Sequence, residues 1–227
     1  MRATRLPDLF NPFRERDPAY EGRSAARVRR ENLAAYFAAL DGLGGGPRDL
    51  WLAEAPGATG TRRTGIPLVD ERELEMANRA YAIAPALRRA TRADAGAPRG
   101  TSTGRAIWQE IGRTGYRPVL WNVLLHHPER YVSGRLTNRA PRVGEVRYFA
   151  PLIRGAYERW CYDTAAERPP RVVAIGKFAE RAALALGLPA VHYVRHPAQG
   201  GLTAFRAGMA RLYGDAGEGA RGVGLVS

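Results

Sequence analysis

The chain has 227 residues, of which 45% are hydrophobic and 25% charged, and this composition is typical of one folded domain rather than a disordered protein. No apolar stretch is long enough to span a membrane and the N-terminus has no apolar signal core, so we expect a cytoplasmic protein that does not associate with membranes. The single cysteine, Cys161, excludes a disulfide framework within the chain and any site that needs four cysteine ligands.

The net charge of +13 is the strongest global signal in the composition. Positive charge attracts polyanions, and nucleic acid is the usual reason for such an excess. Almost all of the cations are arginines, whose planar head group suits bidentate contacts with phosphate. An arginine-rich proteome would leave the same imbalance, so the charge alone leaves both explanations open.

The N-terminal part of the chain is predicted to contain an arm, a helix and a linker. Residues 1–20 are rich in proline and charge and are expected to form an irregular arm. A helix is predicted from Ser24 to Leu40, because its apolar residues are spaced to share one face. The glycine-rich segment 42–47 follows this helix and precedes a strand, the reverse of the order in a dinucleotide-binding loop, so it is expected to be a linker.

The rest of the chain alternates between predicted strands and helices. Four short apolar segments have the composition of buried strands: Asp49–Ala53, Pro118–Leu124, Arg171–Gly176 and Ala190–Arg195. Helical patterns cover residues 101–112, 144–163, 177–186 and 202–213. The alternation predicts a three-layer α/β/α sandwich with a central four-stranded parallel sheet, in one domain over residues 21–213 with a flexible tail at 214–227.

Polar side chains follow three of these predicted strands. The first strand leads to Glu54 and a Pro56–Gly57 turn, the second carries Asn122, and the fourth leads to His196. Ligands of parallel sheets bind beyond the carboxyl ends of the strands. We therefore expect an acid, an amide and a histidine to converge at one edge of the sheet.

These stretches resemble the motifs of the uracil-DNA glycosylase superfamily. "LAEAPG" (52–57) resembles its water-positioning loop, "RHPAQGG" (195–201) its His-Pro loop beside the flipped base, and "LWNVLLHHP" (120–128) the strand whose asparagine reads the base edge. The order and spacing agree over residues 48–212. The resemblance implies an enzyme without metal or cofactor that hydrolyses uracil from DNA and leaves an abasic site. A monomer is the default expectation.

The sequence departs from the pattern of this superfamily at several positions. Leu68 stands where an aromatic residue commonly stacks on the base, and Ala198 where a serine commonly follows His-Pro. The segment 58–65 lacks the further carboxylate that several branches carry. The iron–sulfur branches need four cysteines, which this chain does not have.

The resemblance implies two catalytic residues, Glu54 and His196. Glu54 would orient or deprotonate the attacking water and offset the positive charge of the sugar. Alternatively, it caps the turn by accepting backbone N–H groups. His196 would donate a ring N–H to the O2 of the departing uracil, or else hold its own loop by a bond to the backbone.

Further residues are expected to bind the base and the DNA. Asn122 would present one donor and one acceptor to the base, or satisfy the backbone at the strand end. Pro56 and the amides of Gly57 and Ala58 would line the pocket, where Leu68 would give van der Waals contact or belong to the core. The residues expected to contact DNA are Arg62, Arg63, Ser102, Arg195, Gln199 and Gly200. Solvated surface arginines and an ordinary helix cap at Ser102 are the alternatives.

Three other functions remain compatible with the sequence. A binding protein of the same fold would hold uracil-containing or abasic DNA with little turnover, which the departures at Leu68 and Ala198 favour. A related enzyme would excise another deaminated base, such as hypoxanthine or xanthine. An unrelated nucleotide- or sugar-binding α/β enzyme would explain the sheet but not the motifs.

Overall fold

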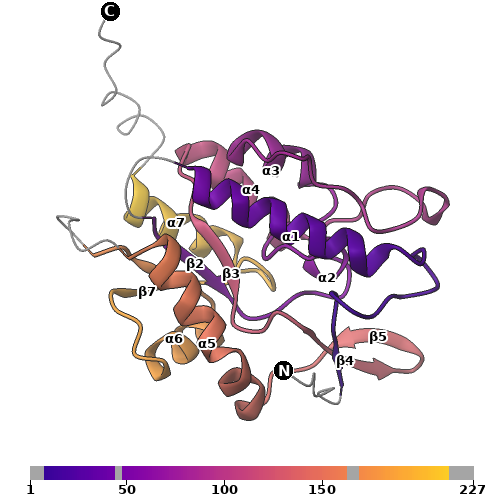
Figure 1. Cartoon of the computed structure of the whole chain (residues 1–227). Coiled ribbons are helices and arrows are strands. Elements are labelled where there is room, and N and C mark those ends of the chain that lie inside the picture. The colour runs from indigo at the N-terminus through magenta and orange to yellow at the C-terminus, as the bar shows by residue number, and fades with distance from the viewer. Residues whose placement is uncertain (1–7, 44–47, 163–168, 215–227) are drawn as a thin grey trace, which may run out of the picture.

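A computed structural model of the chain describes residues 8–43, 48–162 and 169–214 (Figure 1). The expected tail lies outside the described residues, except for Gly214. Residues 1–7 of the expected arm and residues 44–47 of the expected linker lie outside them as well.

The core of the fold is a parallel sheet of four strands, as the sequence predicts. Its spatial order is β3-β2-β6-β7, and every neighbouring pair is parallel. The strands are short and strongly apolar, and Leu50, Trp51 and Leu52 of the second strand are completely buried. Their bounds are Leu50–Ala53 for β2, Val119–Asn122 for β3, Val172–Ile175 for β6 and Val191–Val194 for β7.

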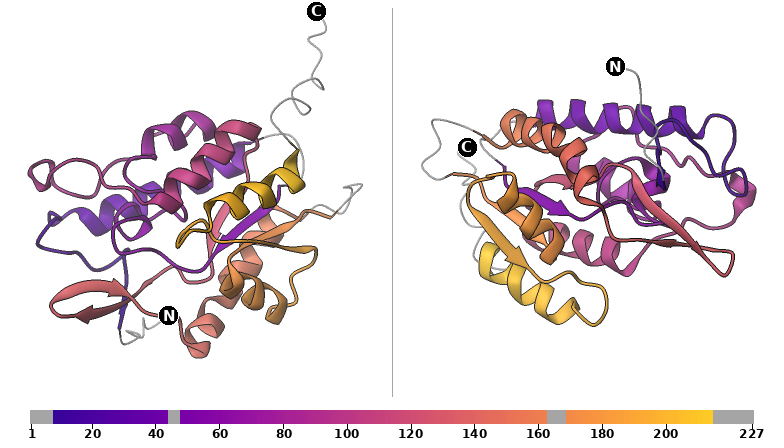
Figure 2. Two further views of the ribbon diagram at one scale, coloured as in Figure 1. Left: turned by 180° about the vertical axis from the view of Figure 1, so that it is seen from behind. Right: turned by 90° about the horizontal axis from the view of Figure 1, so that it is seen from below.

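Helices cover both faces of this sheet, so the predicted three-layer α/β/α architecture is confirmed (Figure 2). On one face α1 packs against α5 through Phe37 and Trp160, and both rings lie near Trp121 of β3. On the other face α4 contacts α7. The five long helices are α1 (Ala25–Gly42), α4 (Ser102–Thr114), α5 (Val143–Trp160), α6 (Lys177–Ala185) and α7 (Leu202–Tyr213). None of the helices in the described ranges is long and apolar enough to cross a membrane.

Several short elements were not expected from the sequence. β1 (Leu9–Phe10), β4 (His127–Val132) and β5 (Arg135–Asn138) form a second, antiparallel sheet in the order β1-β4-β5. The helices α2 (Thr61–Thr64) and α3 (Leu74–Tyr81) and a 3₁₀ turn at Ala93–Ala95 lie between β2 and α4. These elements are too short, or too interrupted by proline and charge, for a periodic pattern to reveal them.

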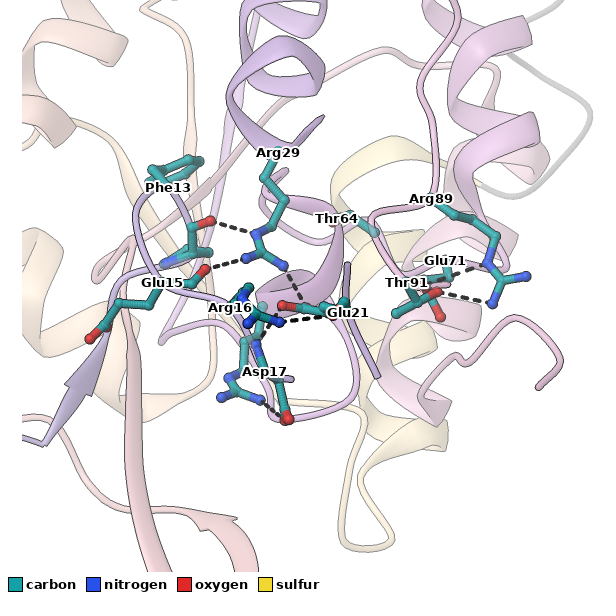
Figure 3. A network of polar contacts seen from close by, with 12 residues as sticks. Phe13, Glu15, Arg16, Asp17, Glu21, Arg29, Thr64, Glu71, Arg89 and Thr91 are labelled. Carbon is teal, nitrogen blue, oxygen red and sulfur yellow. Dashed lines mark hydrogen bonds and ion pairs between the residues drawn. The ribbon is translucent and has the colours of Figure 1, made fainter. Parts of the chain in front are cut away.

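The described part of the expected arm is irregular but packed onto the domain. Arg29 of α1 is completely buried and donates to the side chain of Glu21 and to the backbone oxygens of Pro12 and Glu15 (Figure 3). Phe10 pairs with His127 of β4. Residues 8–20 therefore belong to the folded domain, because a buried guanidinium needs the acceptors that they supply.

Candidate active site

A cavity of about 500 Å³ lies at the carboxyl ends of β2, β6 and β7. Five of the residues singled out in the sequence line it, namely Glu54, Pro56, Arg195, His196 and Gln199. The sheet brings them together from segments about 140 residues apart, because parallel strands end at the same edge. The volume is in the range of pockets that hold small ligands.

Glu54 is the only carboxylate that lines this cavity among the described residues. Its backbone oxygen accepts from Leu124 N at 3.1 Å, which fixes the residue at the strand end. Its carboxylate is half-buried, and no hydrogen bond to it is found in the described part of the chain. Burial raises the pKa of Glu54, and the nearby positive charge of Arg181 opposes that rise. The side chain is therefore a stronger base than an exposed glutamate and is free to bind water.

His196 lies across the same cavity, in the loop after β7. The backbone N–H of Ala198 donates to its Nδ1 at 3.2 Å, so the neutral ring carries its proton on Nε2. Burial, and then the charge of Arg195, lowers the pKa of His196 below its ordinary value. A neutral imidazole with one N–H donor is thus available to a ligand.

Two glycines allow the His196 loop to pack closely. Gly176 has φ +96°, and a Cβ placed on it would lie 3.3 Å from Cβ of His196. A Cβ on Gly201 would lie only 2.0 Å from the backbone oxygen of His196. Just before Gly201, Gln199 and Gly200 both have positive φ, so the chain turns sharply after His196.

The cavity is also lined by residues for which no role was expected from the sequence. Lys177, Phe178 and Arg181 of α6 line it, as does Arg139, which follows β5. The Nζ of Lys177 lies 3.0 Å from a carboxylate oxygen of Glu180, whereas Arg181 makes no ion pair with any described residue. Phe178 supplies an aromatic ring to the wall. One sequence feature could have indicated these α6 residues as part of the site, because the helix begins directly after the third predicted strand.

Asn122 and Leu68 do not line this cavity. Asn122 is 1% exposed and lies opposite Ala53, one residue before Glu54 in the neighbouring strand. Neither its Nδ2 nor its Oδ1 has a partner in the described structure, so a complete amide is buried without hydrogen bonds. Leu68 is 7% exposed and its backbone oxygen accepts from Nε1 of Trp108 at 2.9 Å, which places it in the core.

The turn after Glu54 was expected to offer its backbone amides to the base, but one of them is already hydrogen-bonded. The N–H of Ala58 donates to Oδ1 of Asn138 at 3.3 Å, so this amide is not free to bind a carbonyl of the base. The same oxygen lies 2.8 Å from Nε2 of His127, a buried histidine whose pKa burial lowers to about 4. Gly57 adjoins open space, since a Cβ on it would meet no atom within 4 Å.

Arg62 and Arg63 are buried, which differs from the expectation that they face phosphates. Arg62 pairs with Asp17 at 3.2 Å and Glu129 at 3.4 Å. Its guanidinium also lies 3.8 Å from the ring centre of Phe10. Arg63 lies over the ring of Tyr20. Both arginines hold residues of the N-terminal segment, because acids and aromatic rings distant in sequence surround them.

Ser102, which was expected to contact DNA, is exposed at the start of α4, but the helix N-terminus beside it is already occupied. Oδ2 of Asp70 accepts from N and Oγ1 of Thr101, at 2.7 and 2.6 Å. The chain's own carboxylate therefore takes the place that a phosphate would occupy at this helix N-terminus. Gly104 lets Asp70 approach, since a Cβ there would lie 2.4 Å from Oδ2.

Comparison with solved structures shows the fold. The crystal structure of wild-type SMUG2 from Pedobacter heparinus is similar to this chain with a TM-score of 0.60 and 14% sequence identity. The alignment covers 93% of this chain and 88% of that chain. The two chains therefore share a fold, and the expected architecture of a four-stranded parallel sheet flanked by helices is confirmed. No family model and no curated protein sequence matches the chain.

Proposed function

We propose that this protein is a monofunctional DNA glycosylase that hydrolyses the bond between uracil and deoxyribose in DNA. One observation carries the proposal. The unpartnered carboxylate of Glu54 and the neutral ring of His196 line one cavity at the carboxyl edge of the sheet. The fold shared with SMUG2 and the motif resemblance support it.

The two side chains match the two charges that develop in this reaction. As the bond breaks, the sugar gains oxocarbenium character and uracil leaves as an anion. Glu54 accepts a proton from the attacking water and offsets the sugar charge, and its raised pKa makes it a better base. His196 donates its Nε2 proton in a hydrogen bond to O2 of the leaving base. No metal or cofactor enters this scheme.

The remaining cavity residues would bind the substrate. Arg195 and Arg181 bring positive charge to the mouth, where the phosphates of a flipped nucleotide would pass. Phe178 offers a ring against which the base would pack, a contact that was expected at Leu68. Asn122 lies beside the cavity rather than in its lining, opposite Ala53. It stays the proposed reader of the base edge, because uracil would satisfy both atoms of its unpartnered amide. We propose a cytoplasmic monomer that acts on DNA.

The test uses labelled oligonucleotides with one uracil opposite guanine, opposite adenine or in a single strand. They are incubated with excess protein, and abasic sites are cleaved with alkali. We expect strand cleavage by the wild-type protein, and a loss of about 10²- to 10⁴-fold in Glu54→Gln and His196→Ala. Parallel oligonucleotides with hypoxanthine and xanthine test excision of other deaminated bases.

Two matched variants control for the substitutions themselves. Glu158→Gln changes an exposed glutamate on α5, and His192→Ala changes an exposed histidine on β7. Both should cleave like the wild-type protein. Equal cleavage by Glu54→Gln and wild type would disprove the proposed mechanism. Salt-sensitive DNA binding without any cleavage would identify a binding protein instead.

A further inference from the structure

The β4–β5 hairpin starts at the cavity and extends beyond the body of the protein (Figures 1 and 2). At its base, Pro128, Asn138 and Arg139 line the cavity. Tyr131 lies three residues further along β4, which is about 10 Å at roughly 3.3 Å per residue. That distance corresponds to about three stacked bases. A nucleic acid strand entering the cavity would therefore pass along the hairpin.

The base of the hairpin is firmly anchored. Asn138 holds both His127 and the N–H of Ala58. Glu129 pairs with the buried Arg62, and β1 pairs with β4 along one edge. At the tip, Ser133 and Gly134 both have positive φ and join paired Val132 and Arg135, so the strands are connected by a tight two-residue turn. The hairpin is a defined ribbon rather than a loose loop.

The outer half of the ribbon has two different faces. Side chains alternate along a strand, so Tyr131 and its cross-strand partner Leu136 share one face. The side chain of Tyr131 is unusually exposed, at 66%. Arg130, Val132 and Arg135 share the other face, and neither arginine has an ion pair with any described residue. One face thus offers an exposed aromatic ring and the other two unpaired cations.

We infer that this hairpin is a DNA-binding element that contacts both strands beside the flipped nucleotide. Tyr131 stacks on a base of the strand that enters the cavity, about three nucleotides from the flipped one. Arg130 and Arg135, on the opposite face, contact phosphates of the complementary strand. The inference rests on the proposed function, because it takes DNA as the substrate in the cavity. Aromatic stacking and phosphate neutralisation are the usual means by which proteins hold an opened strand.

The experiment measures DNA binding by fluorescence anisotropy with the full chain carrying Glu54→Gln, which prevents cleavage. The DNA contains uracil and is either duplex or single-stranded. Tyr131→Ala should weaken binding to both by roughly fivefold or more, and Tyr131→Phe should restore it, since the ring stacks without its hydroxyl. The double variant Arg130→Ala/Arg135→Ala should weaken duplex binding and reduce its salt slope by about 1.8, while single-strand binding changes little.

Matched variants elsewhere on the surface separate this role from general charge effects. Tyr162→Ala removes an exposed tyrosine after α5, and Arg117→Ala/Arg211→Ala removes two exposed arginines away from the cavity. Both should bind DNA like the parent. Hairpin variants that bind like these controls would overturn the inference, as would equal losses on duplex and single strand for the arginine pair. A wild-type chain that binds DNA through the hairpin without cleaving it would overturn the proposed function but leave the hairpin assignment standing.

Discussion

The backbone N–H of Ala198 donates to Nδ1 of His196 at 3.2 Å. This single bond decides which ring nitrogen carries the proton and holds the ring in the cavity wall. It also explains why alanine serves in the position after His-Pro, since the contact uses the backbone and not a side chain.

The two nitrogens of His196 can be tested separately. His196→Asn keeps an acceptor near the place of Nδ1 but loses the Nε2 donor, so we expect a normal thermal midpoint and a rate loss of about 10²- to 10³-fold. His196→Gln retains a donor near the place of Nε2, so it should keep more activity than the asparagine variant. Single-turnover rates and thermal unfolding of both variants check this. A faster reaction with asparagine than with glutamine would contradict the assigned proton.

The pH dependence of the reaction should follow Glu54. The carboxylate must be ionised to accept a proton, and burial raises its pKa, so the rate should rise with pH through a midpoint above the ordinary glutamate value. The charge of Arg181 lowers this pKa, so Arg181→Gln should move the midpoint to higher pH. Arg211→Gln, on an exposed residue near the far end of α7, is the control. Rate profiles for the three proteins between pH 4 and 9 test the prediction, and an unmoved or lowered midpoint in Arg181→Gln would refute it.

Gly176 should be needed for the site and not only for its backbone conformation. Gly176→Ala brings a Cβ to 3.3 Å from His196 and also strains a residue at φ +96°. Gly187→Ala also places an alanine at positive φ, +67°, but its Cβ meets no atom within 4 Å. Gly187→Ala should lose about 1–2 kcal/mol of unfolding free energy. Gly176→Ala should lose more, because φ +96° with ψ 155° is open essentially to glycine alone, and only this variant should also lose activity. Denaturant unfolding and single-turnover rates separate the two effects.

The N-terminal segment should depend on one buried ion pair. Arg29→Met leaves Glu21 buried without its cation and frees two backbone oxygens, so we expect a loss of about 3–5 kcal/mol of unfolding free energy. Arg27→Met breaks an exposed pair with Glu31 on the same helix and should cost less than about 1 kcal/mol. Urea unfolding of both variants measures the difference. Similar losses in the two would show that residues 8–20 add little to stability.

The sequence alone predicted the parallel sheet and the edge where Glu54 and His196 meet. Both depend on short-range signals: apolar runs of four or five residues, helical spacing between them, and the residue that follows each strand. Because parallel strands end at one edge, the chain order was enough to bring these side chains together. The role of Asn122 in base binding stays a prediction, whereas that of Phe178 is proposed from the cavity lining.

Other features depended on partners far away in the sequence. Arg62 and Arg63 stand in a polar, glycine-containing segment typical of a surface loop, yet Asp17, Glu129 and Phe10 bury Arg62. The start of α4 has the pattern of an anion site, yet Asp70 fills it. The hairpin has no clean alternation, since Pro128, Glu129 and Arg130 interrupt β4, and its strand pairing with β1 spans over a hundred residues.

The difference between the features that the sequence predicted and those that it missed has a physical cause. Periodicity and strand-end chemistry are properties of a few consecutive residues, so the sequence displays them directly. Whether a charged side chain meets water, a phosphate or an acid of its own chain depends on which distant segment packs against it. Only the tertiary structure decides which partner the side chain has, because a buried charge is stable only beside an opposite charge or a hydrogen-bonding group.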